Sequence, residues 1–273
     1  MRNQRAVYPP TFRGFVEFAQ ENKELIEEQD SVVEFIVHLS ERAILSGDDH
    51  LYYDPYLIVQ LVSGVRGACF LHPGDVREID FDRCVGKPVL EVVETVPLPI
   101  GIALLDAYYS LLNQRLGVTP KNIYTFNGMG ADKSLKRAQK IVELAKIKKD
   151  SKVLLIGVIS DIVREILNLN AQVKLADFLL SGTKVHGIEV AYDAIPFLDW
   201  ADIIIMTGNV LKTETLQDLL KQISNRNKKL IVYALTGGHI APYYREYGAS
   251  VVTVEKFPFY WYANLASTIE IYT

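Results

Sequence analysis

The chain has 273 residues, of which 49% are hydrophobic and 23% are charged. A chain of this composition can fill one large or two ordinary globular cores, so extended disorder is excluded as its main state. The 33 acidic and 29 basic residues give a net charge of −4. This balance offers no general attraction for phosphate backbones and argues against nucleic acid as a partner.

Membrane and secretory segments are not expected. The most apolar window, residues 96–105, is broken by two prolines and ends at Asp106, so it is too short to span a bilayer. Residues 8–10 read Tyr-Pro-Pro where a secretory signal would carry its apolar run. Cys69 and Cys84 form no CxxC pair, which excludes a disulfide scaffold and a four-cysteine zinc site. We therefore expect a cytoplasmic protein with no membrane partner.

The amino-terminal third predicts an α+β unit. Apolar residues at helical spacing predict one helix near residues 12–19 and a second over 32–39, where His38 would lie on a buried helix face. Runs of Val, Ile and Tyr over residues 52–79, interrupted by glycines, predict hairpin-forming strands. A further helix is predicted over residues 99–116, ending at a glycine.

The carboxyl-terminal half alternates strand and helix patterns after a basic helix predicted within residues 127–150, whose charged face we expect to be solvated. Fully apolar runs suit strands covered on both faces, and their alternation with helices requires parallel crossovers. These runs lie at residues 153–156, 173–177, 203–206, 230–234 and 251–254. We therefore predict an α/β chain, with a small α+β domain at residues 1–126 and a doubly wound, Rossmann-like parallel-sheet domain at 127–273.

A doubly wound sheet binds ligands beyond the carboxyl ends of its strands. In this sequence the turns at those ends hold small, hydroxyl and carboxylate residues, which bind ligands through backbone and side chain together. The same residue types also serve as plain turn residues in α/β proteins. The candidate ligand-binding residues are Gly157, Asp177, Thr207, Gly208, Asn209, Thr236, Gly237 and Gly238.

Gly157 and Asp177 allow a nucleotide interpretation, because a glycine after the first strand and an acid after the second are how Rossmann domains hold a ribose. However, the segment GVISDI has a single glycine, and Asp161 near the helix start would repel a pyrophosphate. NAD and NADP are therefore disfavoured as cofactors. S-adenosylmethionine stays open, and an empty structural scaffold is favoured over both.

His239 follows two glycines in a loop at the predicted crevice, where an imidazole could bind a divalent metal or transfer protons. The equally weighted alternative is a loop histidine that caps the next helix. His72 and His186 stand beside glycines and are expected to be surface turn residues. No HExxH, Walker A or CxxC motif occurs, and no GxSxG with a triad. Whether the protein is an enzyme stays open.

The carboxyl-terminal segment after the last predicted strand is unusually aromatic. Its position would let Phe257 or Tyr260 form a wall of the crevice, or let the segment form a dimer interface. The aromatic residues are Phe257, Phe259, Tyr260, Trp261 and Tyr262.

A family resemblance is carried by residues 201–220 (ADIIIMTGNVLKTETLQDLL) and 230–252 (LIVYALTGGHIAPYYREYGASVV). They resemble the carboxyl-terminal Rossmann-like domain of the putative heavy-metal-chelation family, whose members pair it with an enolase-amino-terminal-like domain. Residues 94–113 (ETVPLPIGIALLDAYYSLLN) are similar to the family's proline-containing segment that leads into a helix. Two departures are Asp106, where the resemblance suggests Asn, and the TGGH turn at 236–239, where a Gly-Pro-Ser-Thr-like turn is more usual.

The resemblance implies a cleft between two domains and a role in handling a metal or a metal chelate. We therefore expect a protein that binds a small polar ligand, such as a metal chelate or its organic precursor, with Pro99 in a cleft wall formed by residues 97–101. Two alternatives stay open. One is a transferase that uses S-adenosylmethionine or a nucleotide, and the other is a non-catalytic homodimeric scaffold whose interface is the aromatic segment.

Overall fold

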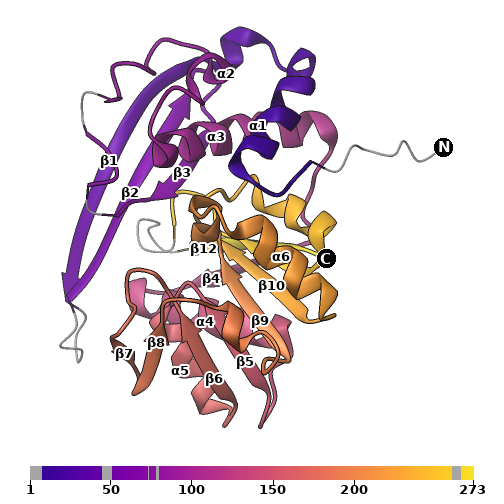
Figure 1. Ribbon diagram of the computed structural model, residues 1–273. Helices are drawn as coiled ribbons and strands as arrows, with labels where there is room; N and C mark the ends of the chain where they lie inside the picture. The colour runs from indigo at the N-terminus through magenta and orange to yellow at the C-terminus, as the bar shows by residue number, and fades with distance from the viewer. Residues whose placement is uncertain (1–7, 45–50, 73, 78–79, 260–265) are drawn as a thin grey trace.

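The computed structural model describes residues 8–44, 51–72, 74–77, 80–259 and 266–273. These residues form a three-stranded sheet of order β1-β2-β3 and a nine-stranded sheet of order β4-β12-β11-β10-β9-β5-β6-β8-β7. Figure 1 shows the amino-terminal elements above the carboxyl-terminal ones. The predicted α/β class, with a small α+β part before a mainly parallel sheet, is confirmed. None of the described helices is long and apolar enough to cross a membrane.

The amino-terminal part packs helices against the small antiparallel sheet. Thr11 caps the first helix, since its hydroxyl accepts a hydrogen bond from the backbone N–H of Gly14 at 3.0 Å. The longest helix ends at Gly117, whose φ of 67° is the left-handed conformation that favours glycine. The elements are α1 (Phe12–Glu21), β1 (Val33–Ile44), β2 (Leu51–Leu61), β3 (Arg66–Phe70), α2 (Val89–Val92) and α3 (Leu98–Leu116).

The helix predicted over residues 32–39 is wrong, because residues 33–39 belong to β1. That strand pairs antiparallel with β2, and Ile36 lies opposite Val59. Four of the eight residues are Val or Ile, whose branched β-carbons restrict rotation and favour an extended backbone. His38 is exposed on the strand and is not the buried helix residue that the sequence predicted.

Helix α3 lies in the interior of the protein and contacts both sheets. An added Cβ at Gly67 in β3 would lie 2.2 Å from the carbonyl oxygen of Ala103 and 2.2 Å from the N–H nitrogen of Ala107. The strand therefore packs directly on the helix backbone, which only glycine permits. The helix is apolar on nearly all sides, as expected of a buried helix, and joins the same hydrophobic cluster as one face of the large sheet.

Six central strands of the large sheet run parallel. They are β5 (Lys152–Ile156), β6 (Gln172–Ala176), β8 (Ile188–Ala191), β9 (Ile203–Thr207), β10 (Lys229–Ala234) and β11 (Ala249–Val254). The apolar runs predicted five of them, and the strand Ile188–Ala191 was not predicted. The sequence did not predict the antiparallel strands at the two edges. They are β4 (Asn122–Asn127) with β12 (Ala266–Tyr272) at one edge and β7 (Lys184–Val185) at the other.

Each face of the parallel strands is covered by helices, which explains why most successive strand residues are apolar. One face packs on α4 (Gly130–Ala145) and α5 (Ser160–Asn168). The other packs on α6 (Leu216–Asn225), on the 3-10 helix Ala241–Tyr247 and on α3.

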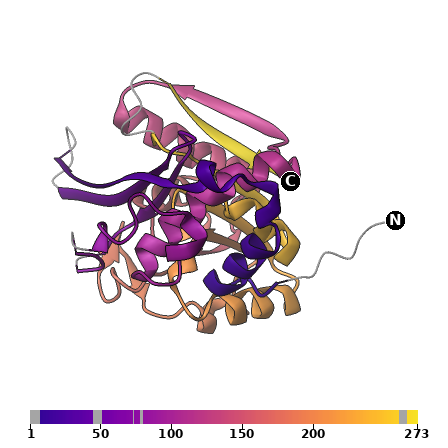
Figure 2. The same cartoon turned by 90° about the horizontal axis from the view of Figure 1, so that it is seen from above.

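The boundary expected between residues 126 and 127 falls inside β4. This strand pairs with β12 in the large sheet, where Phe126 lies opposite Ser267, and Figure 2 shows the two strands side by side along one edge of the molecule. We propose that the division into two domains lies before β4, in residues 117–121.

Candidate functional site

The large sheet has a topological switch point between β5 and β9. From β5 the chain adds β6 and β8 on one side, and it then returns to add β9, β10 and β11 on the other. At the carboxyl ends of the two strands, an added Cβ at Gly157 would lie 1.9 Å from Oγ1 of Thr207, and the φ of Gly157 is 79°. Ligands of doubly wound sheets bind at this kind of position.

A cleft of about 1470 Å³ opens at this edge of the sheet. Its lining includes Tyr56, Phe70, His72 and Pro99 from the amino-terminal part, together with the turns that follow β5, β6, β9 and β10. Seven of the residues that the sequence nominated line the cleft, and their role in binding stays a prediction. They are Pro99, Gly157, Asp177, Thr207, Gly208, Asn209 and Thr236.

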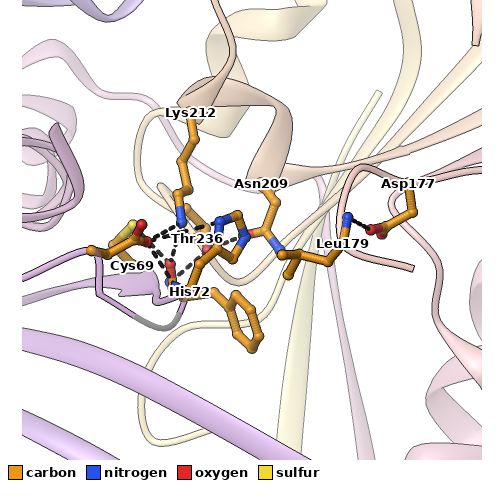
Figure 3. Close-up of polar contacts among 9 residues, drawn as sticks. Cys69, His72, Asp177, Leu179, Asn209, Lys212 and Thr236 are labelled. Atoms are coloured by element: carbon orange, nitrogen blue, oxygen red, sulfur yellow. Dashed lines mark hydrogen bonds and ion pairs between the residues drawn. The ribbon is translucent and has the colours of Figure 1, made fainter. Parts of the chain in front are cut away.

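A polar network joins the two parts of the protein at one end of the cleft. Lys212, which follows β9, places its Nζ 2.6 Å from Oδ2 of Asp75 and 3.1 Å from the carbonyl oxygen of Phe70. Asp75 Oδ2 also accepts a hydrogen bond from the N–H of His72 at 2.7 Å. Figure 3 shows that the side chains of Lys212 and His72 converge on one region from different elements. The Lys212 side chain is 8% exposed, so this ion pair is largely shielded from solvent.

Thr236 extends this network into the sheet. Its Oγ1 accepts a hydrogen bond from the N–H of Phe70 at 2.9 Å and donates one to Oδ1 of Asn209 at 2.7 Å. The hydroxyl therefore connects the end of β3 with the turns after β9 and β10. Gly208 packs beneath it, since an added Cβ there would lie 2.3 Å from the carbonyl oxygen of Thr236.

His72 is part of the cleft and not a surface turn residue as predicted. Its side chain is 27% exposed, and it lines the cleft beside the Lys212–Asp75 pair. Burial, followed by the positive charge of Lys212, lowers the pKa of His72 from 6.5. The imidazole is therefore neutral at pH 7, and one of its nitrogens can accept a hydrogen bond or bind a metal. Burial raises the pKa of the neighbouring Cys69 thiol to about 12, so this cysteine is not a thiolate at neutral pH.

His239, the predicted metal ligand, does not line the cleft, and neither do Gly237 and Gly238. The N–H of His239 donates to Oδ1 of Asp106 at 2.6 Å, and its carbonyl accepts from Nδ2 of Asn113 at 2.7 Å. The residue is 8% exposed and packs against α3. Within the part of the chain that the structure describes, no three His, Cys, Asp or Glu residues are grouped to hold a metal ion.

Asp177 is used mainly to organise the turns around it. Its Oδ2 accepts from the N–H of Val158 at 2.9 Å, and its Oδ1 accepts from Leu179 at 2.9 Å and Leu180 at 3.2 Å. A carboxylate has about four acceptor positions. Because three are occupied by backbone groups, the two hydroxyls of a ribose would have to displace at least one of these bonds. The S-adenosylmethionine alternative gains no support from this geometry.

The basic face of α4 is only partly solvated. Lys136 is exposed as predicted, but Lys133 is 1% exposed and Arg137 is 4% exposed. Arg137 donates from Nη2 to Oγ of Ser134 at 3.0 Å and lies 3.7 Å from the carboxylate of Glu255. Arg137 lines the cleft, so the expectation of a solvated face is wrong for this residue.

Acidic residues outnumber basic residues in the lining of the cleft. Among the described lining residues, five are acidic and three are basic. The acidic residues are Asp75, Asp161, Asp177, Asp193 and Glu214, and the basic ones are Arg137, Lys184 and Lys212.

The aromatic carboxyl-terminal segment contributes one described residue to the cleft. Phe259 is 1% exposed, lines the cleft and packs on Tyr56 with ring centroids 4.7 Å apart. Phe257, which was expected to form a wall, instead packs on Phe259 with centroids 5.6 Å apart. Tyr260, Trp261 and Tyr262, for which the sequence predicted a wall or a dimer interface, lie outside the described residues.

Comparisons with known proteins agree with this architecture. A family model, DUF364, described as "Putative heavy-metal chelation", matches residues 140–255. A crystal structure of a DUF364 protein of unknown function from Desulfitobacterium hafniense DCB-2 is similar with a TM-score of 0.59 and 15% identity, covering 95% of this chain and 99% of that one. A second DUF364 protein of unknown function, from Pyrococcus horikoshii, has a TM-score of 0.53 and 13% identity, with coverage of 94% and 99%. A search of curated proteins gave no match.

Proposed function

We propose that this chain, whose residues 140–255 match the DUF364 family model, binds a small metal chelate, or the organic chelator alone, in the cleft between its amino-terminal and carboxyl-terminal parts. One observation carries the proposal. The polar network of Lys212, Asp75, His72, Asn209 and Thr236 converges on a cleft at the switch point of the sheet and draws on both parts of the chain. A few convergent polar groups in a mainly apolar cleft are typical of small-molecule sites.

In this proposal the chelator supplies the atoms that bind the metal, and the protein surrounds the complex. Three of the five cleft carboxylates are already engaged in holding the fold. Asp75 is paired with Lys212, Asp161 lies 2.7 Å from Arg164, and Asp177 accepts three backbone hydrogen bonds. Among the groups that the cleft offers a ligand are the neutral ring of His72 and the side-chain amide of Asn209.

The excess of carboxylates in the cleft favours a ligand that carries a cation. A metal bound to a small chelator is attracted by this field, whereas a pyrophosphate or nucleotide is repelled. The charge balance therefore supports a metal chelate over a phosphate-bearing nucleotide.

Isothermal titration calorimetry tests the proposal with nickel–glycinate, a small cationic chelate, and with Ni²⁺ and glycine separately. We expect heat of binding for the complex that weakens at least about fivefold in Asp75→Asn, because the substitution removes a cleft carboxylate and leaves the positive charge of Lys212 without its partner. Asp218→Asn, an exposed change on α6, is the matched control and should bind as wild type does.

Two further titrations separate the alternatives. His239→Ala should bind the complex as wild type does, because His239 does not line the cleft; a loss of affinity in a folded variant would restore His239 to the site. S-adenosylmethionine should give no heat. Binding of S-adenosylmethionine, with none of nickel–glycinate, would replace this proposal with the transferase alternative.

A further inference from the structure

Large apolar side chains are exposed along one wall of the cleft. Phe178 is 48% exposed, Leu179 52%, Tyr192 65% and Ile195 38%, and all four line the cleft. They come from the turns that follow β6 and β8, two strands that pair in parallel through Ala176 and Ala191. Exposed apolar residues gathered in a concave region mark a surface that is covered when a partner or ligand is bound. We call these four residues the aromatic wall.

The two rings of the aromatic wall are arranged together. The centroids of Phe178 and Tyr192 are 4.9 Å apart, with an angle of 56° between the ring planes. Such a tilted pair leaves ring faces and edges available to a third ring, which gains most from an offset or edge-to-face contact.

Hydrogen bonds hold the backbone of the aromatic wall in place. Asp177 Oδ1 accepts from the N–H groups of Leu179 and Leu180, and the contact with Leu179 is visible in Figure 3. Asp193 Oδ1 accepts from the N–H of Ile195 at 3.0 Å. The apolar side chains are therefore presented to solvent by turns that carboxylates fix. A fixed surface loses less entropy on binding than a loose loop does.

We propose that the ligand of this cleft carries a flat aromatic ring, which packs on the aromatic wall while its polar end meets the His72 and Lys212 network. This inference rests on the proposed function and names the substrate class as aromatic metal chelators. A small molecule is favoured over a protein partner because the wall lines the same concave space as the polar network. A site of this kind binds ligands that are apolar at one end and polar at the other.

Two nickel complexes test the inference, because they differ in the ring alone. Picolinate and glycinate both bind nickel through one nitrogen and one carboxylate oxygen, and their one-to-one complexes carry the same charge. We expect nickel–picolinate to bind wild type about tenfold more tightly than nickel–glycinate in calorimetry. In Phe178→Ser and in Tyr192→Ser this ratio should fall close to one. Ile123→Ser replaces a 61% exposed residue on the edge strand β4 and should keep the wild-type ratio.

The outcomes distinguish this inference from the proposed function. Equal binding of both complexes to wild type, or a ratio that persists in both serine variants, overturns the aromatic wall and leaves chelate binding intact. Absence of binding by either complex overturns the proposed function and this inference with it. Light scattering on the same proteins tests whether the aromatic wall instead binds a second copy of the chain. If wild type is a dimer and Tyr192→Ser is a folded monomer, the wall is a dimer interface and the inference is overturned.

Discussion

Asp106 in α3 holds the backbone of His239 in place, with its Oδ1 2.6 Å from the His239 nitrogen. The other oxygen of the same carboxylate accepts from the N–H of Ala68 in β3 at 2.8 Å. One buried side chain therefore fastens the small sheet and the turn after β10 to a single helix. The family resemblance has asparagine here, which could accept only one of the two hydrogen bonds with its single oxygen.

Asp106→Asn should lower the free energy of unfolding by about 1–3 kcal/mol. The substitution leaves one buried N–H facing an amide donor, so that its hydrogen bond is lost. Urea unfolding followed by circular dichroism measures the change. The exposed Asp82→Asn is the matched control and should shift stability by less than about 0.5 kcal/mol. Equal stability of Asp106→Asn and wild type would show that the carboxylate does not fasten the two parts.

Gly157→Ala should destabilise the protein by about 2 kcal/mol or more. The new methyl group would meet Oγ1 of Thr207 at 1.9 Å, and the φ of 79° is unfavourable for alanine. Part of this loss should be recovered when Thr207→Ala is combined with it, because the smaller side chain removes the overlap with the hydroxyl. A thermal unfolding series of the two single variants and the double variant measures this coupling, and strict additivity would contradict the packing described here.

His72 should make stability depend on pH. Its pKa in the folded protein lies below the unfolded value of 6.5, so the unfolded chain binds more protons in the window below pH 6.5. The contribution of neutral His72 to the free energy of unfolding is fully present above about pH 6.5, and it is lost as the pH falls through the pKa of His72 in the folded protein. Urea unfolding at pH 7.5 and pH 5.0 should show a smaller loss in His72→Gln than in wild type. His38→Gln, at an exposed position, should follow wild type.

The Lys212–Asp75 pair should show a measurable coupling energy. Its atoms lie 2.6 Å apart, and the lysine side chain is 8% exposed against 21% for the aspartate. A double-mutant cycle with Lys212→Met and Asp75→Asn should give a coupling of about 1–2 kcal/mol in unfolding free energy. A coupling near zero would mean that solvent screens the pair and that it does not order this end of the cleft.

Much of the large sheet could be predicted from the sequence, because the parallel strands are covered on both faces and most of their residues are apolar. The antiparallel edge strands lack this continuous apolar pattern and were therefore not predicted. In β4 only Phe126 is buried, so the run NIYTFN has no continuous apolar pattern. Residues 32–39 were ambiguous for a related reason, since short apolar runs satisfy both helical and strand spacing.

The polar network could not be predicted, because it depends on contacts between distant parts of the chain. Phe70 and Thr236 are 166 residues apart, yet their N–H and hydroxyl lie 2.9 Å from each other. Residues at the strand ends could be predicted as candidate ligand-binding residues, because the topology alone brings them to one edge of the sheet. His72, Asp75 and Lys212 could not be predicted to meet, because their contact depends on the position of the small sheet over that edge. The local sequence signal for this region was the segment HPGD after β3.

The most direct test of chelate binding is a crystal structure of the protein soaked with nickel–picolinate, with data collected at the nickel absorption edge. We expect an anomalous peak inside the cleft, between the His72 and Lys212 end and the rings of Phe178 and Tyr192. A well-occupied peak at any other place, with none in the cleft, would contradict the assignment of this cleft as the ligand site.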